Sequence, residues 1–395
     1  MYSTVLVALD GSPDSRAGAS LSLEVARHLG CSLVAVHVYD AAIHDARFRE
    51  MEPGLPGRYR EPGVLDELRR SHDGLMGEGF RALSHGYLEG FLAEARDAGV
   101  SAVEAVARGR NYVELLRLAR DRGVGLLVLG AQGLGAQGDG QFGSTAARVL
   151  RGAPCDVLLA RAGAPRGPVL AGVDGSPGAE TALRRAAAWS GLLGAALEVA
   201  AAYDPELHRT IFRVMGRALP LERQMEVGLD RQEELHDRII DDGLGALYRS
   251  FLGEAGALAR RLGREPGEVL LRGKAYRALV DRAVAVGAGL AVLGRFGHNR
   301  EEGSDLGSHA EAVARLAPCH VLVAAAPGGG GGPSPGEELP WEPGAAARLG
   351  RVPPVARAMA RRVVEDAARA AGEGTVTAEA FDQVARRLGM GPGEG

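Results

Sequence analysis

Cysteine is scarce in this sequence, and the scarcity excludes several kinds of site. The 395 residues include three cysteines, Cys31, Cys155 and Cys319, which lie far apart and form no CxxC pair. An odd and widely spaced set builds neither a disulfide framework nor a tetrahedral zinc site. We therefore expect three small, buried, apolar side chains in a protein of a reducing compartment.

Positive charge and long apolar runs are also lacking. The formal net charge is −4, without the basic surplus that a general nucleic-acid-binding protein would carry. No apolar run approaches the ~20 residues of a membrane helix. The first residues, MYSTVLVALDG, predict a strand and not a signal peptide. We predict a cytoplasmic protein that binds neither nucleic acid nor membrane.

What is present is an ordinary globular composition with a clear internal repeat. VLVALDGSP at 5–13 returns as VLAGVDGSP at 169–177, so Asp10 corresponds to Asp174 at an offset of 164 residues. Four more pairs of segments follow this offset without a gap: 71–79 with 235–243, 107–116 with 271–280, 127–133 with 291–297, and 152–160 with 316–324. A duplicated unit of ~164 residues, a usual domain size, explains all five.

Each unit alternates short apolar segments with helical ones. In the first unit Ser12 is a suitable N-cap and Pro13 a suitable first helical residue. The segment 40–98 mixes helical stretches with irregular pieces rich in proline and glycine. Strands are predicted at 5–9, 32–38, 103–107, 126–129 and 157–160, and further helices at 111–122 and 144–151. This alternation predicts a doubly wound parallel sheet, an α/β fold, in each unit.

A glycine-rich loop after the fourth strand carries the chemistry. Its glycines are Gly130, Gly133 and Gly143, with spacing G-x2-G-x9-G, and Ser144 follows. Glycine lets backbone N–H groups approach an anion, and the start of the next helix favours phosphate. Asp10 ends the first strand, where open α/β sheets bind ligands. Its carboxylate would repel phosphate and therefore suits ribose hydroxyls or an adenine amine.

The G-x2-G-x9-G-[ST] motif, present twice with a strand-end aspartate, resembles that of the universal stress protein family over about residues 1–326. The resemblance implies an adenine-nucleotide fold with strand order 3-2-1-4-5. It also implies that ATP, ADP or AMP binds, with or without Mg²⁺, and that the last strands pair within the chain, 157–160 with 321–324. The residues it implicates are Asp10, Val38, Gly130, Gly133, Gly143, Ser144 and Thr145, and in the second unit Asp174, Ala202, Gly294, Gly297, Gly307, Ser308 and His309. Adenosine would lie near Asp10 and the backbone of Val38, ribose near Gly130, and phosphates near the remaining residues.

Some features depart from this pattern, and they leave open which site binds nucleotide. The segments 40–98 and 204–262 look longer than the usual family insertion. The first loop contains no basic residue, so backbone alone would meet the phosphate charge. The second loop contains basic residues beside acidic ones: Arg295, His298 and Arg300, with Glu301, Glu302 and Asp305. Either loop, or both, could also be a vacant relic.

Three other patterns in the sequence indicate no further site. The spelling Gly133-x-Gly135-x-x-Gly138 matches a dinucleotide fingerprint, but it follows a late strand, and the helix begins only near Ser144. No GxxxxGK[ST] P-loop and no nucleophile–base–orienter set occurs. The steps 72–73 and 236–237, both His-Asp, lack a third ligand for a metal and suit a helix start or packing.

The C-terminal tail follows a Gly/Pro linker at 327–338. Apolar residues at every fourth position predict an amphipathic helix that begins near 353–354 and stops at Gly372: Val355, Met359, Val363 and Ala367. Thr377 should cap a second helix, 378–388. Residues 341–387 resemble the C-terminal domain of the B-type subunit of light-independent protochlorophyllide reductase. No cysteine cluster serves an iron–sulfur centre, so reductase activity is not transferred, and a docking module for an unknown protein partner is the simpler interpretation.

The predicted domains are therefore 1–163 and 164–326, both nucleotide-binding, the linker 327–338, and a small helical module at 339–395. We expect an adenine-nucleotide-binding stress or regulatory protein whose nucleotide occupancy tunes a partner's association. The two repeats would form an intramolecular pseudo-dimer, and a homodimer of whole chains is left open. The alternatives are a slow ATPase, an accessory factor in tetrapyrrole reduction, or a scaffold with vacant sites.

Overall fold

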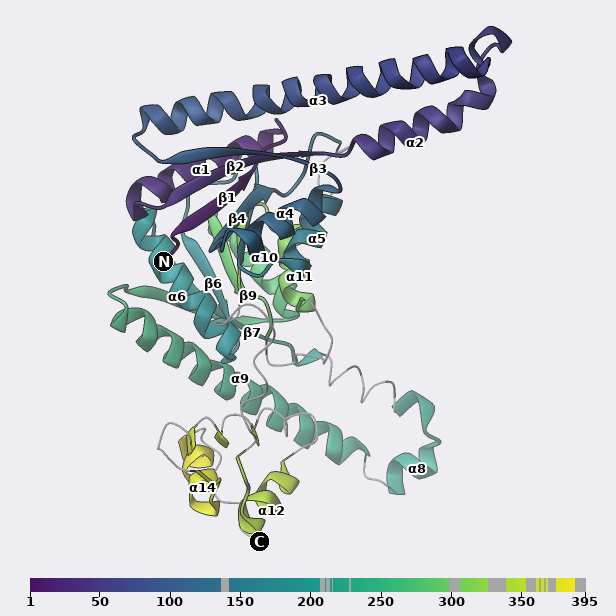
Figure 1. Cartoon of the computed structure of the whole chain (residues 1–395). Helices are drawn as coiled ribbons and strands as arrows, with labels where there is room; N and C mark the ends of the chain where they lie inside the picture. Colours follow the sequence, from purple (N-terminus) through teal and green to yellow (C-terminus); the bar gives the residue numbers. More distant parts are fainter. Residues whose placement is uncertain are drawn as a thin grey trace.

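The computed structural model describes residues 1–135, 142–206, 216–226, 229–297, 306–325, 339–352 and 374–387, with the single positions 210, 214, 360, 361, 364, 365, 367 and 368. Most of these residues belong to one continuous sheet with helices on both faces (Figure 1). None of the helices in the described part of the chain is long and apolar enough to span a membrane.

The sheet has ten strands in the order β3-β2-β1-β4-β5-β10-β9-β6-β7-β8. The first unit supplies β1 (Thr4–Ala8), β2 (Ser32–Tyr39), β3 (Ala102–Arg108), β4 (Leu126–Gly130) and β5 (Asp156–Ala160). The second supplies β6 (Val169–Val173), β7 (Leu197–Tyr203), β8 (Pro266–Arg272), β9 (Leu290–Gly294) and β10 (His320–Ala324). Each half is parallel with order 3-2-1-4-5, which confirms the predicted fold.

The two halves join through their last strands. β5 and β10 pair antiparallel, with Val157 opposite Val323 and Leu159 opposite Val321, as expected for an intramolecular pseudo-dimer. A buried carboxylate at the start of β5 strengthens the junction. Asp156 accepts hydrogen bonds from the hydroxyl of Tyr2 at 2.8 Å and from Nε of Arg185, in the second repeat, at 2.6 Å. Because both repeats satisfy this one buried charge, separating them would leave it unpaired.

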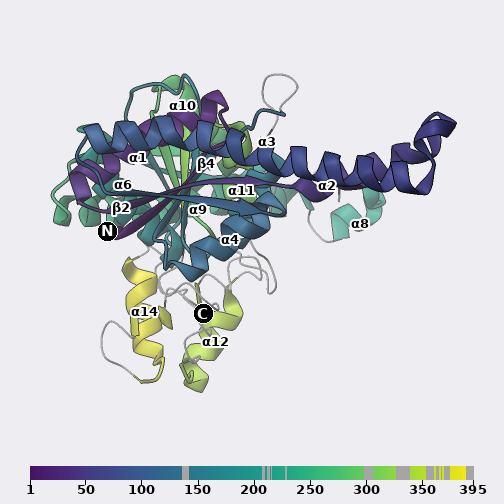
Figure 2. The ribbon, with the colours of Figure 1, turned by 45° about the horizontal axis from the view of Figure 1, so that its top comes forward.

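Side chains alternate along the strands and feed two apolar cores, one on each face of the sheet. One face is covered by α1 (Pro13–Leu29), α3 (Pro62–Asp97), α6 (Pro177–Leu192) and α9 (Leu229–Arg261). The other is covered by α4 (Asn111–Asp121), α5 (Ser144–Gly152), α10 (Ala275–Ala285) and α11 (Ser308–Leu316). Each core runs through both repeats, so the sheet and its two helical layers pack as one unit (Figure 2).

The strands and the short helices lie within one or two residues of their predicted positions. Ser12 caps α1 as predicted, with its hydroxyl accepting the N–H of Ser15 at 3.1 Å, and Pro13 follows at the first helical position. Ser176 and Pro177 do the same for α6. The local signals of the repeat therefore mark the helix starts correctly.

The segment 40–98 is more helical than its sequence indicates. It forms α2 (Ala41–Met51), two short 3-10 turns, Glu52–Gly54 and Gly57–Tyr59, and the single helix α3 of 36 residues, about 54 Å long at 1.5 Å per residue. The start of α3 and all of α2 project beyond the sheet (Figure 2). In the second repeat, α8 (Leu221–Glu226) precedes the 33-residue α9.

The tail has a small core of its own. α12 (Pro343–Arg351) contributes Ala345 and Leu349, and α14 (Ala378–Arg387) contributes Phe381 and Val384. Thr377 caps α14 as predicted, by accepting the N–H of Ala380 at 3.1 Å. Positions 360, 361, 364, 365, 367 and 368 are helical, as expected for the intervening amphipathic helix. Val355, Met359, Val363, Gly372, Leu388 and the linker 327–338 lie outside the described residues.

Candidate functional site

Each repeat brings its strand-end aspartate against the second glycine of its loop. Asp10 is held by the N–H of Ser12, which donates to Oδ1 at 3.0 Å. A Cβ atom added at Gly133 would lie 2.8 Å from the other oxygen, Oδ2. The second repeat repeats this arrangement, because a Cβ at Gly297 would meet Oδ2 of Asp174. Parallel strands β1 and β4 are neighbours, so their carboxyl ends place these groups together.

The first glycine of each loop is explained by packing. A Cβ at Gly130 would lie 2.8–3.0 Å from the carbonyl oxygen of Gln132, Cβ of Asp14 and the amide nitrogen of Ser15. A Cβ at Gly294 would collide with the backbone of Gly178 at the start of α6. These glycines allow the loop to cross the helix start closely, so their side-chain face is filled by protein and not by ligand.

The third glycine closes the base of the loop and begins a helix. The N–H of Gly143 donates to the carbonyl of Ala131 at 2.9 Å, and that of Gly307 to the carbonyl of Arg295 at 2.8 Å. No side chain caps α5 or α11 within the described residues. Ser144, Thr145, Ser308 and His309 lie in the first turns, whose N–H groups point out of the helix and favour an anion.

Val38 and Ala202 lie at the corresponding strand ends. Ala8 of β1 pairs with Val36 of β2, so Val38 continues the strand beside Asp10. Val173 of β6 pairs with Ala201 of β7, so Ala202 lies beside Asp174. The structure therefore groups every predicted site residue of each repeat around the carboxyl ends of three adjacent strands.

Aromatic side chains from the long helices form one wall beside each aspartate. Gly11 has a φ of 76°, and a Cβ there would lie 2.5 Å from the ring of Tyr87 on α3. The ring of His37 packs edge-on against Tyr87 at 5.1 Å, and its Nδ1 lies 2.7 Å from the hydroxyl of Ser84. Burial lowers the pKa of His37, which favours the neutral imidazole. No sequence motif predicts this wall, because Tyr87 and Ser84 on α3 are distant from Asp10 in the sequence.

The second repeat has a different wall. Phe251 takes the place of Tyr87 against Gly175, and Tyr248 packs against Phe251 with ring centroids 5.6 Å apart. Burial and then the nearby charge of Asp174 raise the pKa of Tyr248. The two candidate sites therefore share backbone geometry but differ in the side chains that face the aspartate.

Asp14 is a site residue that the sequence did not reveal. Its carboxylate accepts the N–H of Gln132 in the loop at 3.0 Å and the N–H of Ala162 after β5 at 2.7 Å. An acidic residue in the first turn of a helix is common, so its role as a loop anchor had no separate signal. In the second repeat Gly178 takes this position, and the loop backbone at Phe296 lies directly against it.

Arg295, a basic residue of the second loop, reaches across the junction to the first repeat. Its guanidinium donates to the carbonyl oxygens of Ala153, at 2.5 Å, and Cys155, at 3.3 Å, across the junction. His298, Arg300, Glu301, Glu302 and Asp305 lie outside the described residues. Among the basic residues of the second loop, Arg295 therefore helps to join the repeats.

The His-Asp step at 72–73 has a packing role. His72 lies inside α3 and not at a helix start, and its ring stacks on Phe48 of α2 with centroids 4.5 Å apart. The side chains of the second step, His236 and Asp237, are not described. Among the side chains that are described, no three His, Cys, Asp or Glu residues are grouped to hold a metal.

Comparison with known proteins identifies the family. The family model "Universal stress protein family" matches residues 1–161 and 165–325, most of the chain. The chain belongs to the universal stress protein family. A model described as "Proto-chlorophyllide reductase 57 kD subunit" matches residues 341–384, which confirms the resemblance seen in the tail.

Individual relatives of this universal stress protein each match one repeat. A universal stress protein from Thermus aquaticus is 32% identical over 163 residues, which is 41% of this chain and all of that protein. YxiE of Bacillus subtilis is 27% identical over 161 residues, also 41% of this chain and all of the relative.

Among solved structures, a protein of unknown function from Pseudomonas aeruginosa PAO1 aligns with a TM-score of 0.50 at 15% identity, over 82% of this chain and 93% of its own. This likeness shows the tandem fold. A universal stress protein solved in complex with cAMP covers 41% of this chain and 98% of its own at 23% identity. Its TM-score of 0.27 is too low to assign a ligand to this universal stress protein.

Proposed function

We propose that this universal stress protein binds an adenine nucleotide such as ATP, and that nucleotide occupancy tunes the association of a protein partner. The observation that supports it is the grouping, in each repeat, of a strand-end aspartate, a glycine backbone and an uncapped helix start. Asp10 would accept a hydrogen bond from ribose or the adenine amine. The N–H groups of Gly133 and of the first turn of α5 would hold phosphates.

The tail supports the second half of the proposal. It has its own core and lies at the end of a Gly/Pro-rich segment, so it is suited to contact a separate protein. The proposed boundaries are those of the sequence: repeats at 1–163 and 164–326, a linker at 327–338 and the helical module at 339–395.

The first test is to denature the purified full chain and identify any released nucleotide by chromatography, then to titrate nucleotide-free protein with ATP and adenosine by calorimetry. We expect ATP to bind at least about tenfold more tightly than adenosine, because phosphate gains charge-assisted bonds to backbone N–H groups. Equal affinity for ATP and adenosine would remove the phosphate role of the loops.

Variants then assign the working repeat. Gly143→Asp and Gly307→Asp each place a negative charge where phosphate should lie, and one of them should lower ATP affinity at least about tenfold. Gly74→Asp, an exposed position of α3 with open space around it, is the control of equal charge. Gly143→Ala separates the steric effect of a Cβ, which would lie 3.1 Å from the carbonyl oxygen of Ala131, from the charge. Wild-type protein that neither carries nor binds ATP would refute the proposal.

A further inference from the structure

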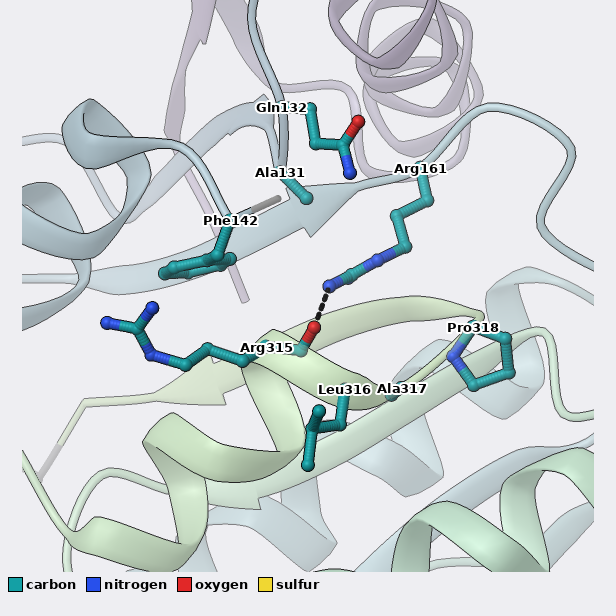
Figure 3. Close-up of a pocket in the computed structure, with 8 residues that line it drawn as sticks. All are labelled: Ala131, Gln132, Phe142, Arg161, Arg315, Leu316, Ala317 and Pro318. Atoms are coloured by element: carbon teal, nitrogen blue, oxygen red, sulfur yellow. Dashed lines mark hydrogen bonds between the residues drawn. The ribbon is translucent and has the colours of Figure 1, made fainter. Parts of the chain in front are cut away.

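A cavity of about 240 Å³ lies where the two repeats meet, behind the first glycine loop (Figure 3). One wall comes from the first repeat and the other from the end of α11 and the turn into β10. The lining residues are Ala131, Gln132, Phe142, Arg161, Arg315, Leu316, Ala317 and Pro318. None of them is among the residues predicted to touch nucleotide, so this is a separate space.

The cavity exists because one small residue breaks the internal symmetry. The repeat offset relates Ala131 to Arg295 and Ala317 to Ala153. In the second repeat, the side chain of Arg295 crosses the junction and donates to the carbonyl of Ala153. In the first repeat, the corresponding residue Ala131 has only a methyl group. The equivalent space between Ala131 and Ala317 is therefore part of the cavity.

The charge around the cavity is positive. Arg161 is half-buried, and its guanidinium donates to the carbonyls of Ala314, at 2.5 Å, and Cys319, at 3.3 Å. Arg315 lies over the ring of Phe142 at 4.9 Å.

The described carboxylates beside the cavity already have partners of their own. Glu311 is shared between Arg315 and Arg151, each at 2.8 Å. Asp14 is bonded to backbone N–H groups on the loop side. Two guanidiniums therefore line the cavity and none of its described lining residues is acidic, while burial lowers the pKa of Arg161, which is the sign of a charge deprived of solvent. An anion would complete the set.

Apart from Gln132, the rest of the described lining is apolar, and the cavity has a suitable size. Phe142, Leu316, Ala131 and Pro318 supply hydrocarbon surface beside the two arginines (Figure 3). An apolar cavity of about 150 Å³ is enough for one benzene molecule, so 240 Å³ accommodates a ring with a carboxylate attached. We propose that this cavity binds a small monocarboxylate with one apolar ring, its carboxylate toward Arg161 and Arg315 and its ring against Phe142 and Leu316.

The bound molecule would contact the face of the glycine loop that is opposite the proposed nucleotide. Ala131 accepts the N–H of Gly143, and Phe142 directly precedes that glycine, so the base of the loop forms part of the cavity wall. The occupant and the proposed nucleotide would therefore meet opposite sides of one loop without sharing contacts.

The test uses benzoate as the probe with the full chain, measured by calorimetry and by saturation-transfer NMR. Wild type should bind one benzoate per chain. Ala131→Arg copies the side chain that occupies the equivalent space and should weaken benzoate at least about tenfold. Ala82→Arg, at an exposed position of α3, adds the same side chain elsewhere and should leave binding unchanged. Benzamide, which lacks the charge, should also bind at least about tenfold more weakly.

Arg315→Gln offers a second variant at a more exposed position, expected to weaken benzoate about tenfold if Ala131→Arg does not fold. No binding by wild type up to about 10 mM, equal binding by Ala131→Arg, or displacement of benzoate by ATP would each overturn the proposal.

Discussion

Acid should weaken the junction between the repeats through His320. This residue begins β10, and its Nδ1 accepts the backbone N–H of Arg161 at 3.2 Å, so the ring is neutral with its proton on Nε2. Burial, and then the charge of Arg161, lower the pKa of His320 from 6.5 to about 4. At the position related by the repeat, Asp156 accepts the N–H of Ala325 at 2.9 Å, so both strand starts bind the opposite chain segment in the same way.

The magnitude follows from the two pKa values. In the unfolded chain His320 takes up a proton near pH 6.5, whereas in the folded protein it stays neutral until about pH 4. Between these values the unfolded state binds more protons, so stability falls as the pH falls. The loss is about 2 kcal/mol from pH 7 to pH 5 and about 3 kcal/mol once the pH is below 4.

The measurement is urea unfolding followed by circular dichroism at pH 7, 6 and 5, on wild type and on His320→Asn. Asparagine can still accept the Arg161 N–H but does not titrate. Because His37 also has a lowered pKa, the difference between the two proteins is the quantity that counts. The stability advantage of wild type should shrink by about 2 kcal/mol between pH 7 and pH 5. Parallel pH curves for the two proteins would refute the assignment to His320.

Two further predictions concern the cores. Trp189 is fully buried and donates to the hydroxyl of Tyr2 at 3.4 Å, so Trp189→Ala should cost about 3–5 kcal/mol in urea unfolding, whereas a loss under 1 kcal/mol would contradict its place in the core. Thr377→Ala removes the cap of α14 and should lower the stability of the tail by about 1 kcal/mol. Amide hydrogen exchange should become faster in 378–387 and stay unchanged in β1–β10. An equal change in both regions would show that the tail and the sheet unfold together.

The strands and helix starts were predictable because their signals are local. An apolar run of four or five residues that ends just before Asp10 or Gly130 predicts a buried strand wherever it lies in the sheet. Ser12 and Thr377 cap their helices by bonds that span only three residues. The family resemblance carried by the repeat also predicted the order of the strands in the sheet and the pairing of 157–160 with 321–324.

The long helix α3 was not predictable in the same way. Several glycines in 62–97 lower its intrinsic helix propensity, and each costs about 1 kcal/mol relative to alanine. Packing of Leu88, Phe91 and Ala95 into the core outweighs that cost at the end of the helix that covers β2 and β3. Tertiary contact, which no window of sequence contains, therefore decided this element.

The sequence by itself determined the duplicated α/β unit, the positions of the glycine loops, and the grouping of Asp10 with Gly133, because parallel strands must end at one edge of the sheet. Only the tertiary structure decided which side chains contact the opposite repeat around the β5–β10 junction. The direction of Arg295, the anchoring of the loop by Asp14 and the cavity beside Ala131 all depend on acceptors or walls that are distant in the chain. Residues related by the repeat offset occupy equivalent places, but what each side chain contacts is set by the opposite repeat.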